Sequence, residues 1–187
     1  MCDSGRDRFV SRAGEKLAHA LTAFSISPAG WTCADLGCST GGFVDCLIRH
    51  GAEKVYAVDR GYGVLDARLR ADRRVVVMER TDALCLVLPE PVRLVTIDAG
   101  WTRQFMILPA ARRLAAEAGQ IVTLVKPHYE AEPALLRGGV LPDDLTEQVV
   151  EPLRAGLTIL GVRLVAEAES PIRGKAGNRE LLWHLAV

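Results

Sequence analysis

A glycine-rich turn that follows a short apolar run is the first feature with chemical potential. Residues 33–43 read CADLGCSTGGF, in which Gly37, Gly41 and Gly42 would let the backbone pass close to a ligand. The spacing is GxxxGG, which differs from the GxGxxG of dinucleotide folds, and no GxxxxGK[ST] sequence occurs. Asp35 precedes the turn, where its charge would repel a pyrophosphate and attract the ammonium or sulfonium of a methionine derivative. The turn therefore favours S-adenosyl-L-methionine as the cofactor.

Two further carboxylates follow the next apolar runs. Asp59 ends KVYAVD, 24 residues after Asp35, and could accept both ribose hydroxyls of an adenosine. Arg60 keeps an NADP site open as an alternative, although the glycine spacing for it is absent. Asp82 follows VVVME and could bind the adenine amine or stand as a solvated loop carboxylate. The predicted cofactor-binding residues are Asp35, Gly37, Ser39, Thr40, Gly41, Gly42, Phe43, Asp59, Arg60, Asp82 and Asp98.

The elements that would position these residues alternate along the chain. Short apolar runs are separated by amphipathic stretches, which is typical of βα units and a parallel sheet. We predict seven strands: Thr32–Leu36, Lys54–Val58, Arg74–Met78, Leu94–Ile97, Gln120–Val125, Arg163–Glu169 and Glu180–Ala186. A short loop joins the last two, so they should form an antiparallel hairpin. The predicted fold class is α/β, with a mostly parallel seven-stranded sheet.

Helices should fill the intervals between the strands. The first covers SRAGEKLAHALTAF, with Ser11 as its N-cap and an apolar face that includes Leu17 and Leu21. The others are predicted near Gly42–His50, Val64–Ala71, Gln104–Ala118 and Thr146–Leu160. The stretch 128–144 is predicted to be the longest irregular segment, a candidate substrate lid.

Composition narrows the class of protein. With 187 residues, 49% hydrophobic and 25% charged, residues 1–187 are predicted to form one globular domain. The 23 basic and 23 acidic side chains cancel, so a nucleic acid would need a local basic patch. No apolar run or signal peptide indicates a membrane, and we predict a cytoplasmic protein. The five cysteines, without a CxxC pair, indicate buried free thiols and no metal site: Cys2, Cys33, Cys38, Cys46 and Cys85.

Several short motifs, in order from about Phe9 to the C-terminus, carry a family resemblance. FVSRAGEKL, ADLGCSTGGF, VYAVDRGYG, IDAG, LVKPHYE, RGGV and GNRELLW resemble the FtsJ-like ribosomal RNA 2′-O-methyltransferases, most closely the hemolysin A (TlyA) branch. The resemblance implies a Rossmann-like class I methyltransferase fold, S-adenosyl-L-methionine as cofactor, and ribosomal RNA or a ribosomal subunit as partner. Matched motif to motif, it places a Lys-Asp-Lys-Glu catalytic set on Lys16, Asp98, Lys126 and Glu180.

This set suits methyl transfer to a ribose hydroxyl. The hydroxyl is a poor nucleophile at neutral pH, so a base that removes its proton would help it to attack. A lysine can be that base only when neutral, which burial beside a second ammonium favours and nearby carboxylates oppose. Pro127 biases Lys126 toward an extended conformation, as expected at the C-terminal end of a strand.

Basic and aromatic residues near the set are candidates for contacting RNA. Arg8, Arg12 and Lys16 recur every four residues and could grip phosphates. Tyr129 could stack on a base. Each of these residues is also compatible with a plain structural or solvated role. Further candidates of the same kinds are Tyr62, Trp101, Arg103, Arg137, Arg173 and Lys175.

The sequence also departs from the family's pattern. Members of the branch usually carry an N-terminal alpha-L RNA-binding module, whereas this sequence starts almost directly at FVSR, so we expect docking through the catalytic domain, a partner or the ribosome. Ala99-Gly100-Trp101 replaces the usual Val-Ser-Phe after Asp98, and His128-Tyr129 replaces Gln-Phe. The alternatives are a small-molecule methyltransferase and a non-catalytic hemolysin-like binding protein.

Overall fold

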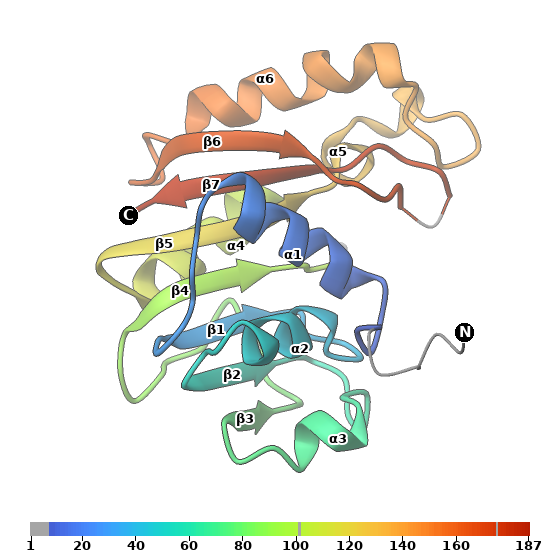
Figure 1. Ribbon diagram of the computed structural model, residues 1–187. Coiled ribbons are helices and arrows are strands. Elements are labelled where there is room, and N and C mark those ends of the chain that lie inside the picture. Colours follow the sequence, from blue (N-terminus) through green and yellow to red (C-terminus); the bar gives the residue numbers. More distant parts are fainter. Residues whose placement is uncertain (1–7, 101, 175) are drawn as a thin grey trace.

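A single seven-stranded sheet forms the centre of the molecule (Figure 1). The computed structural model describes residues 8–100, 102–174 and 176–187. The sheet has the order β3-β2-β1-β4-β5-β7-β6. The first five strands are parallel, and β7 runs antiparallel to both β5 and β6. Their bounds are Thr32–Leu36 (β1), Lys54–Val58 (β2), Val75–Met78 (β3), Val92–Ile97 (β4), Ala115–Val125 (β5), Arg163–Glu169 (β6) and Leu181–Ala186 (β7). The predicted α/β class and C-terminal hairpin are confirmed.

Helices cover both faces of the sheet. One face carries α1 (Ala13–Ala23), α2 (Gly42–Arg49) and α3 (Ala67–Arg70), and the other carries α4 (Gln104–Leu114) and α6 (Thr146–Gly156). The connection from β5 to α6 contains α5 (Pro127–Glu130) and two 3-10 turns, η1 (Pro133–Leu135) and η2 (Asp143–Leu145). The prediction that 128–144 is irregular was therefore wrong in part.

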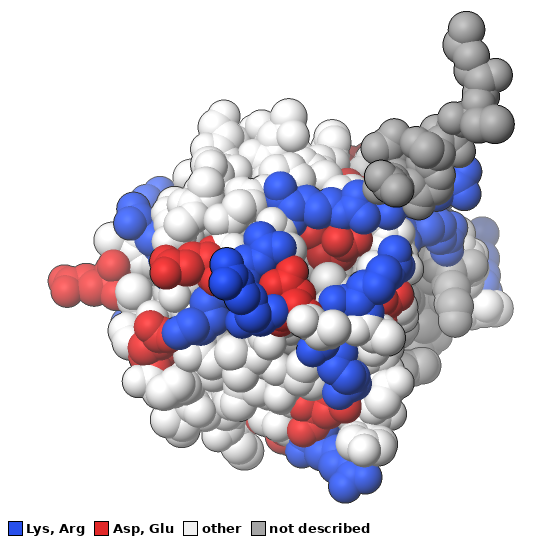
Figure 2. Space-filling view, turned by 60° about the horizontal axis from the view of Figure 1, so that its bottom comes forward, with Lys and Arg blue, Asp and Glu red and all other residues white. Residues whose placement is uncertain are grey.

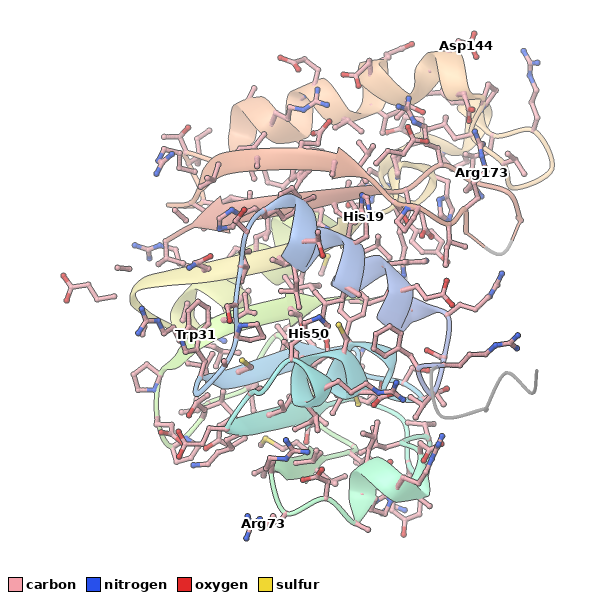
Figure 3. The ribbon with its side chains drawn as sticks, viewed as in Figure 1. His19, Trp31, His50, Arg73, Asp144 and Arg173 are labelled. Carbon is pink, nitrogen blue, oxygen red and sulfur yellow. The ribbon has the colours of Figure 1, made fainter. Side chains whose placement is uncertain are left out.

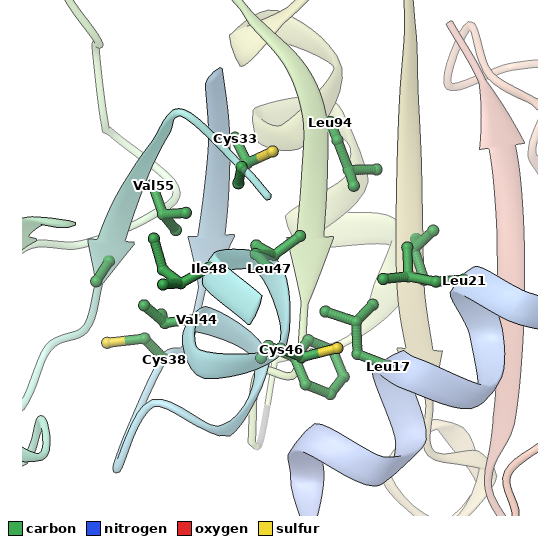
Figure 4. Close-up of a cluster of buried hydrophobic side chains, with 14 of the residues drawn as sticks. Leu17, Leu21, Cys33, Cys38, Val44, Cys46, Leu47, Ile48, Val55 and Leu94 are labelled. Carbon is green, nitrogen blue, oxygen red and sulfur yellow. The ribbon is translucent and has the colours of Figure 1, made fainter. Parts of the chain in front are cut away.

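Two apolar clusters, one on each face, hold the helices to the sheet. On the first face Leu17 and Leu21 of α1 pack with Val44 and Leu47 of α2, all at most 3% exposed (Figure 4). On the second face α4 and α6 share a cluster with the opposite side of the strands. Because the central strands are covered on both sides, they are almost continuously apolar. The sheet is thereby a rigid base for the loops at its edge.

The edge strand β6 is half-exposed and alternates along its length. Glu167 of β6 accepts a hydrogen bond from Trp183 Nε1 at 2.6 Å and from Arg154 of α6 at 2.9–3.0 Å. Charged side chains on an edge strand discourage pairing with another sheet edge. Through Glu167, the β6–β7 hairpin is therefore tied both to the buried Trp183 and to α6.

Some predicted helix ends were wrong. Ser11 does not cap α1, whose N-cap is Arg12 without a side-chain cap bond. The helix predicted over Val64–Ala71 begins only after Asp66, because Asp66 is its N-cap and accepts the Arg68 N–H at 2.9 Å. The predicted Gln104–Ala118 helix ends at Leu114, where β5 starts, and the predicted Thr146–Leu160 helix ends at Gly156.

Charges of both signs are mixed over the surface. Figure 2 looks toward the β3 edge and shows Lys and Arg beside Asp and Glu. Several pairs account for this pattern, such as Arg70 with Glu79 at 2.5 Å and Arg74 with Asp72 at 2.8 Å. Within the described residues, no helix has the length and apolar character needed to cross a bilayer.

The cysteines follow the prediction in three described cases and depart from it in one. Cys33, Cys38 and Cys46 are buried free thiols, and burial raises the pKa of Cys33 to about 12. Cys85 is exposed, which corrects the prediction for that residue. Cys2 lies outside the described residues. The three buried thiols are core residues and stay protonated near neutral pH.

Candidate active site

The glycine-rich turn passes from the C-terminal end of β1 into α2 at the edge where the parallel strands end. Gly37, with φ +86°, has room for no side chain, because a Cβ would lie 2.9 Å from Ala99 Cα and 3.0 Å from the Asp98 carbonyl oxygen. Gly41, with φ +99°, is the N-cap of α2. The turn therefore lies directly against the segment that follows β4, and only glycine fits there.

Asp59, at the end of β2, fixes the outer side of this turn. Its Oδ2 accepts the Ser39 N–H at 2.8 Å, and its Oδ1 accepts the Gly61 N–H at 2.7 Å. Both oxygens retain acceptor capacity, because a carboxylate has about four lone-pair sites. Asp59 thus joins the loops after β1 and β2 and presents negative charge between them.

Asp35 is a buried carboxyl on β1, 1% exposed. Its Oδ1 accepts a hydrogen bond from the Thr96 hydroxyl at 2.8 Å, while Oδ2 has no partner among the described residues. Burial raises the pKa of Asp35 to about 8, and the nearby carboxylates Asp98 and Asp59 add to this rise. An orphaned acceptor of this kind is suited to a cationic or donor group of a ligand.

Asp82 and Arg60 close the far end of the same region. Arg60 Nη2 donates to Asp82 Oδ2 at 3.1 Å, and the Leu84 N–H donates to Asp82 Oδ1 at 3.0 Å. The Arg60 side chain is 78% exposed, so this ion pair forms an outer rim.

A cavity of about 640 Å³ extends from this rim to Asp98 and Lys126. We name it the cofactor cavity, since its lining fits S-adenosyl-L-methionine: it combines four carboxylates, the glycine-rich turn and the apolar residues Ala83 and Leu84. Of the predicted cofactor-binding residues, all except Gly41 line it. The position of a Cβ on Gly41 would instead fall against Leu65 and Leu69, so that residue faces the core.

A second cavity, of about 470 Å³, adjoins the first, and we name it the acceptor cavity. Its walls include Lys16 of α1, Glu180 before β7, and the Asp98 and Lys126 that also line the cofactor cavity. The four residues form two ion pairs: Lys16 Nζ lies 2.5 Å from Glu180 Oε2, and Lys126 Nζ lies 2.6 Å from Asp98 Oδ1. All four side chains are less than 20% exposed. The structure therefore brings together the four residues singled out in the sequence.

The predicted RNA-contacting residues are only partly assembled. Arg12 and Tyr129 line the acceptor cavity, and Lys126 Nζ lies 5.9 Å from the centre of the Tyr129 ring. Arg8 is exposed and lines neither cavity. Tyr62 is exposed, carries the Arg80 guanidinium over its ring and lines neither cavity. Trp101 and Lys175 lie outside the described residues.

Of the other cationic candidates, Arg173 also lines the acceptor cavity and pairs with Asp143. Arg103 and Arg137 line neither of the two cavities.

Some residues that line the two cavities, or that support residues lining them, were not predicted from the sequence. Thr96 holds Asp35, and its place inside an apolar strand gave no signal. His128 lines the acceptor cavity, with a buried Nδ1 that lacks a partner among the described residues. Burial and the nearby Lys126 lower the pKa of His128, so it is neutral at pH 7. Asn178 lies two residues before Glu180 in the same GNRE stretch, but nothing in the sequence singled out its amide.

Comparison with known proteins identifies the family. Residues 9–186 match the FtsJ-like methyltransferase family. The chain belongs to this family. A hemolysin A from Brachyspira hyodysenteriae is 38% identical over 96% of this chain and 78% of its own length. The 16S/23S rRNA (cytidine-2'-O)-methyltransferase TlyA of Mycobacterium tuberculosis is 42% identical over 94% of this chain and 68% of its own length.

Solved structures agree with this FtsJ-like assignment. A structure from Lactococcus lactis named as a hemolysin has a TM-score of 0.92 at 35% identity, and covers 97% of this chain and 89% of its own. An S-adenosylmethionine-dependent methyltransferase from Mesorhizobium loti, at 19% identity and a TM-score of 0.70, shares the Rossmann-like fold; the match covers 95% of this chain and 100% of its own. The cofactor that goes with this family and fold is S-adenosyl-L-methionine.

Proposed function

We propose that this FtsJ-like chain transfers a methyl group from S-adenosyl-L-methionine to a ribose 2′-hydroxyl of ribosomal RNA. One observation carries the proposal: Asp98 and Lys126 line both cavities, so a group bound in one faces a group bound in the other. The name of the Mycobacterium tuberculosis relative supports a ribose of ribosomal RNA as the acceptor. We place the reaction in the cytoplasm, on ribosomal RNA or a ribosomal subunit.

The cofactor cavity would hold its ligand through groups already in place. Asp59 would accept the ribose hydroxyls of the adenosine, and Asp82 the adenine amine. Asp35, with its orphaned oxygen, would face the methionine end. The backbone from Gly37 to Gly42 would lie along the ligand, which in its bound form supplies an electrophilic methyl on a positively charged sulfur. In this assignment residues 1–187 act as one methyltransferase domain.

The acceptor cavity would orient the hydroxyl and take its proton. Lys126, in its neutral form, accepts the proton of the ribose hydroxyl, and Asp98 holds Nζ in position at 2.6 Å. Lys16 donates to the acceptor ribose or its phosphate, and Glu180 fixes its direction. Arg12 and Tyr129, on the same wall, would contact the neighbouring phosphate and base.

The experiment compares two acceptor pools with tritiated S-adenosyl-L-methionine. One pool contains ribosomal subunits from cells that lack this gene, and the other a small-metabolite extract. We expect label in RNA, at a ribose that resists alkaline cleavage of the next bond. Label confined to metabolites would establish a small-molecule methyltransferase instead, and label in neither pool would favour a non-catalytic hemolysin-like protein.

A further inference from the structure

The outer wall of the acceptor cavity is built from two segments that are distant in sequence. One is the RGGV turn, Arg137–Val140, in the connection from β5 to α6. The other, residues 170–180, connects β6 to β7 and ends at Glu180. Gly139, Ile172, Gly174 and Asn178 from these segments all line the cavity. Figure 3 labels Arg173 on the second segment.

Asn178 joins the two segments through its side-chain amide. The Leu141 N–H donates to Asn178 Oδ1 at 2.9 Å, and Asn178 Nδ2 donates to the Gly139 carbonyl oxygen at 3.1 Å. Asn178 is only 3% exposed. Leu141 is buried as well, so removing the amide would leave the Leu141 N–H without this partner, whereas the Gly139 carbonyl oxygen belongs to an exposed residue.

The RGGV turn depends on this support. Arg137 and Val140 exchange two backbone hydrogen bonds, of 2.8 and 3.1 Å, around Gly138 and Gly139. The two glycines have φ values of +59° and +82°, typical of a two-residue hairpin turn. Both are exposed and their Cβ positions meet no other atom within 4 Å. The RGGV turn therefore makes few packing contacts of its own, and the hydrogen bonds of Asn178 help to hold it in place.

The segment that carries Asn178 also packs against Glu180. The Gly174 N–H donates to the Asn178 carbonyl oxygen at 2.9 Å, and a Cβ on Gly174 would lie only 2.7 Å from Glu180 Oε1. The Glu180 carboxylate, in turn, holds Lys16. A displacement of Asn178 would therefore be felt both at the RGGV turn and at the carboxylate of this ion pair.

The segment 170–180 has a second link, at the surface, to η2 just after the RGGV turn. Arg173 pairs with Asp143 at 2.6 Å, and both side chains are about half exposed. Exposed pairs contribute little to stability, typically below about 1 kcal/mol. The buried amide of Asn178 is thus the stronger of the two links.

We infer that Asn178 is a positioning residue for the RNA acceptor: its amide joins the RGGV turn to the segment that carries Glu180 and keeps the outer wall of the acceptor cavity in place. The inference rests on the proposed function for the identity of the acceptor. Because the wall touches a bound strand equally before and during transfer, its loss should weaken acceptor binding more than it slows transfer.

The test uses Asn178→Ala with ribosomal subunits from gene-deleted cells as acceptor. Loss of the buried bond to Leu141 and of the partly buried bond to Gly139 should raise KM for the subunits about tenfold, with a much smaller change in kcat. The affinity for S-adenosylhomocysteine, measured by calorimetry, should be unchanged, because Asn178 does not line the cofactor cavity. Arg179→Ala is the matched control, since the neighbouring Arg179 pairs with Glu169 at 2.8 Å away from both cavities.

Asn178→Asp gives a second readout. Its carboxylate can still accept from Leu141, but its other oxygen would face the Gly139 carbonyl oxygen, and two acceptors repel. The ratio of native to variant kcat/KM should therefore fall toward one as the pH is lowered and the new carboxyl gains a proton. A ratio that does not change with pH would argue against the contact.

Hydrogen exchange separates this inference from the proposed function. In Asn178→Ala, amides 137–141 should exchange faster while those of β1 and β2 keep their rates. The inference is wrong if KM for the subunits stays at the native value, or if the cofactor affinity falls as KM rises. If the native protein methylates no RNA, the proposed function fails, and unchanged exchange at 137–141 would then refute the inference on its own.

Discussion

The Lys16 ammonium lies 2.5 Å from the Glu180 carboxylate, although the two residues are 164 positions apart. Lys16 is on α1, ahead of the first strand, and Glu180 immediately precedes the last. Their side chains are 11% and 4% exposed, so each charge depends on the other for compensation. This pair closes one side of the acceptor cavity, and the pair of Lys126 with Asp98 closes the other.

Lys16→Met should destabilise the protein by about 3 kcal/mol or more, because it leaves the Glu180 carboxylate buried and unpaired. The double variant Lys16→Met with Glu180→Leu should recover most of that stability and no methyl transfer. Urea unfolding measures the first quantity and tritium transfer the second. A single variant as stable as the native protein would mean that the pair is solvated.

Lys126→Ala should abolish methyl transfer and leave S-adenosylhomocysteine binding intact, since Lys126 would act on the acceptor's proton. Lys54→Ala is a suitable control, because Lys54 pairs with Glu90 at 2.7 Å in an exposed position away from both cavities. Single-turnover transfer and calorimetry measure the two effects. Equal loss of transfer and cofactor binding in Lys126→Ala would contradict its assignment as the base.

Asp59→Ala should weaken S-adenosylhomocysteine binding about 100-fold, because charge-assisted hydrogen bonds to the ribose and the support of Ser39 and Gly61 are lost together. Arg60→Ala should have a much smaller effect, since the Arg60 side chain is 78% exposed. Calorimetric titration compares the two variants. An equal effect of both substitutions would place the ribose elsewhere.

The stability of the cofactor-free protein should fall as the pH rises from about 5 to 8 because of Asp35. Its pKa is about 8 in the folded protein and about 3.9 in an unfolded chain, so over this window only the folded state holds the proton. The contribution is complete below pH 3.9, is lost at about 1.4 kcal/mol per pH unit, and ends near pH 8.

Asp35→Asn is the matched comparison for that pH dependence, since asparagine can still accept from Thr96 and does not titrate. Urea unfolding at pH 6 and pH 7 gives the change in the free energy of unfolding for each protein. Subtracting the two changes removes the contribution of the histidines, which both proteins share. Parallel pH profiles for the two proteins would show that Asp35 is ionised throughout.

Strand positions were predictable where the chain is apolar and β-branched. The bounds of β1, β2 and β6 agree with the prediction because a turn or polar residue follows each run: Gly37, Asp59 and Ser170. The start of β5 was missed because residues 115–119, AAEAG, favour a helix by composition, yet Ala115 pairs with Val92 of β4 and the register shifts before Gln120 pairs with Leu94. Tertiary pairing thus overrode local propensity.

Motifs in the sequence singled out Lys16, Asp98, Lys126 and Glu180. They did not show which of these residues pair with one another. Sequence spacing says nothing of whether Lys16 meets Glu180 or Asp98, because that depends on how α1 crosses the sheet. Thr96 and Asn178 gave no usable signal for a related reason. Each acts through a partner in another segment, Asp35 and Gly139, and such contacts arise only on folding.

The position of Glu180 has a consequence for when the acceptor cavity is completed. A ribosome that makes this chain completes α1 well before it reaches β7, so Lys16 is synthesised long before its counter-ion Glu180. Until Glu180 is present, the ammonium of Lys16 on α1 lacks its carboxylate partner. The ion pair that closes one side of the acceptor cavity therefore forms only after the chain has been synthesised through Glu180.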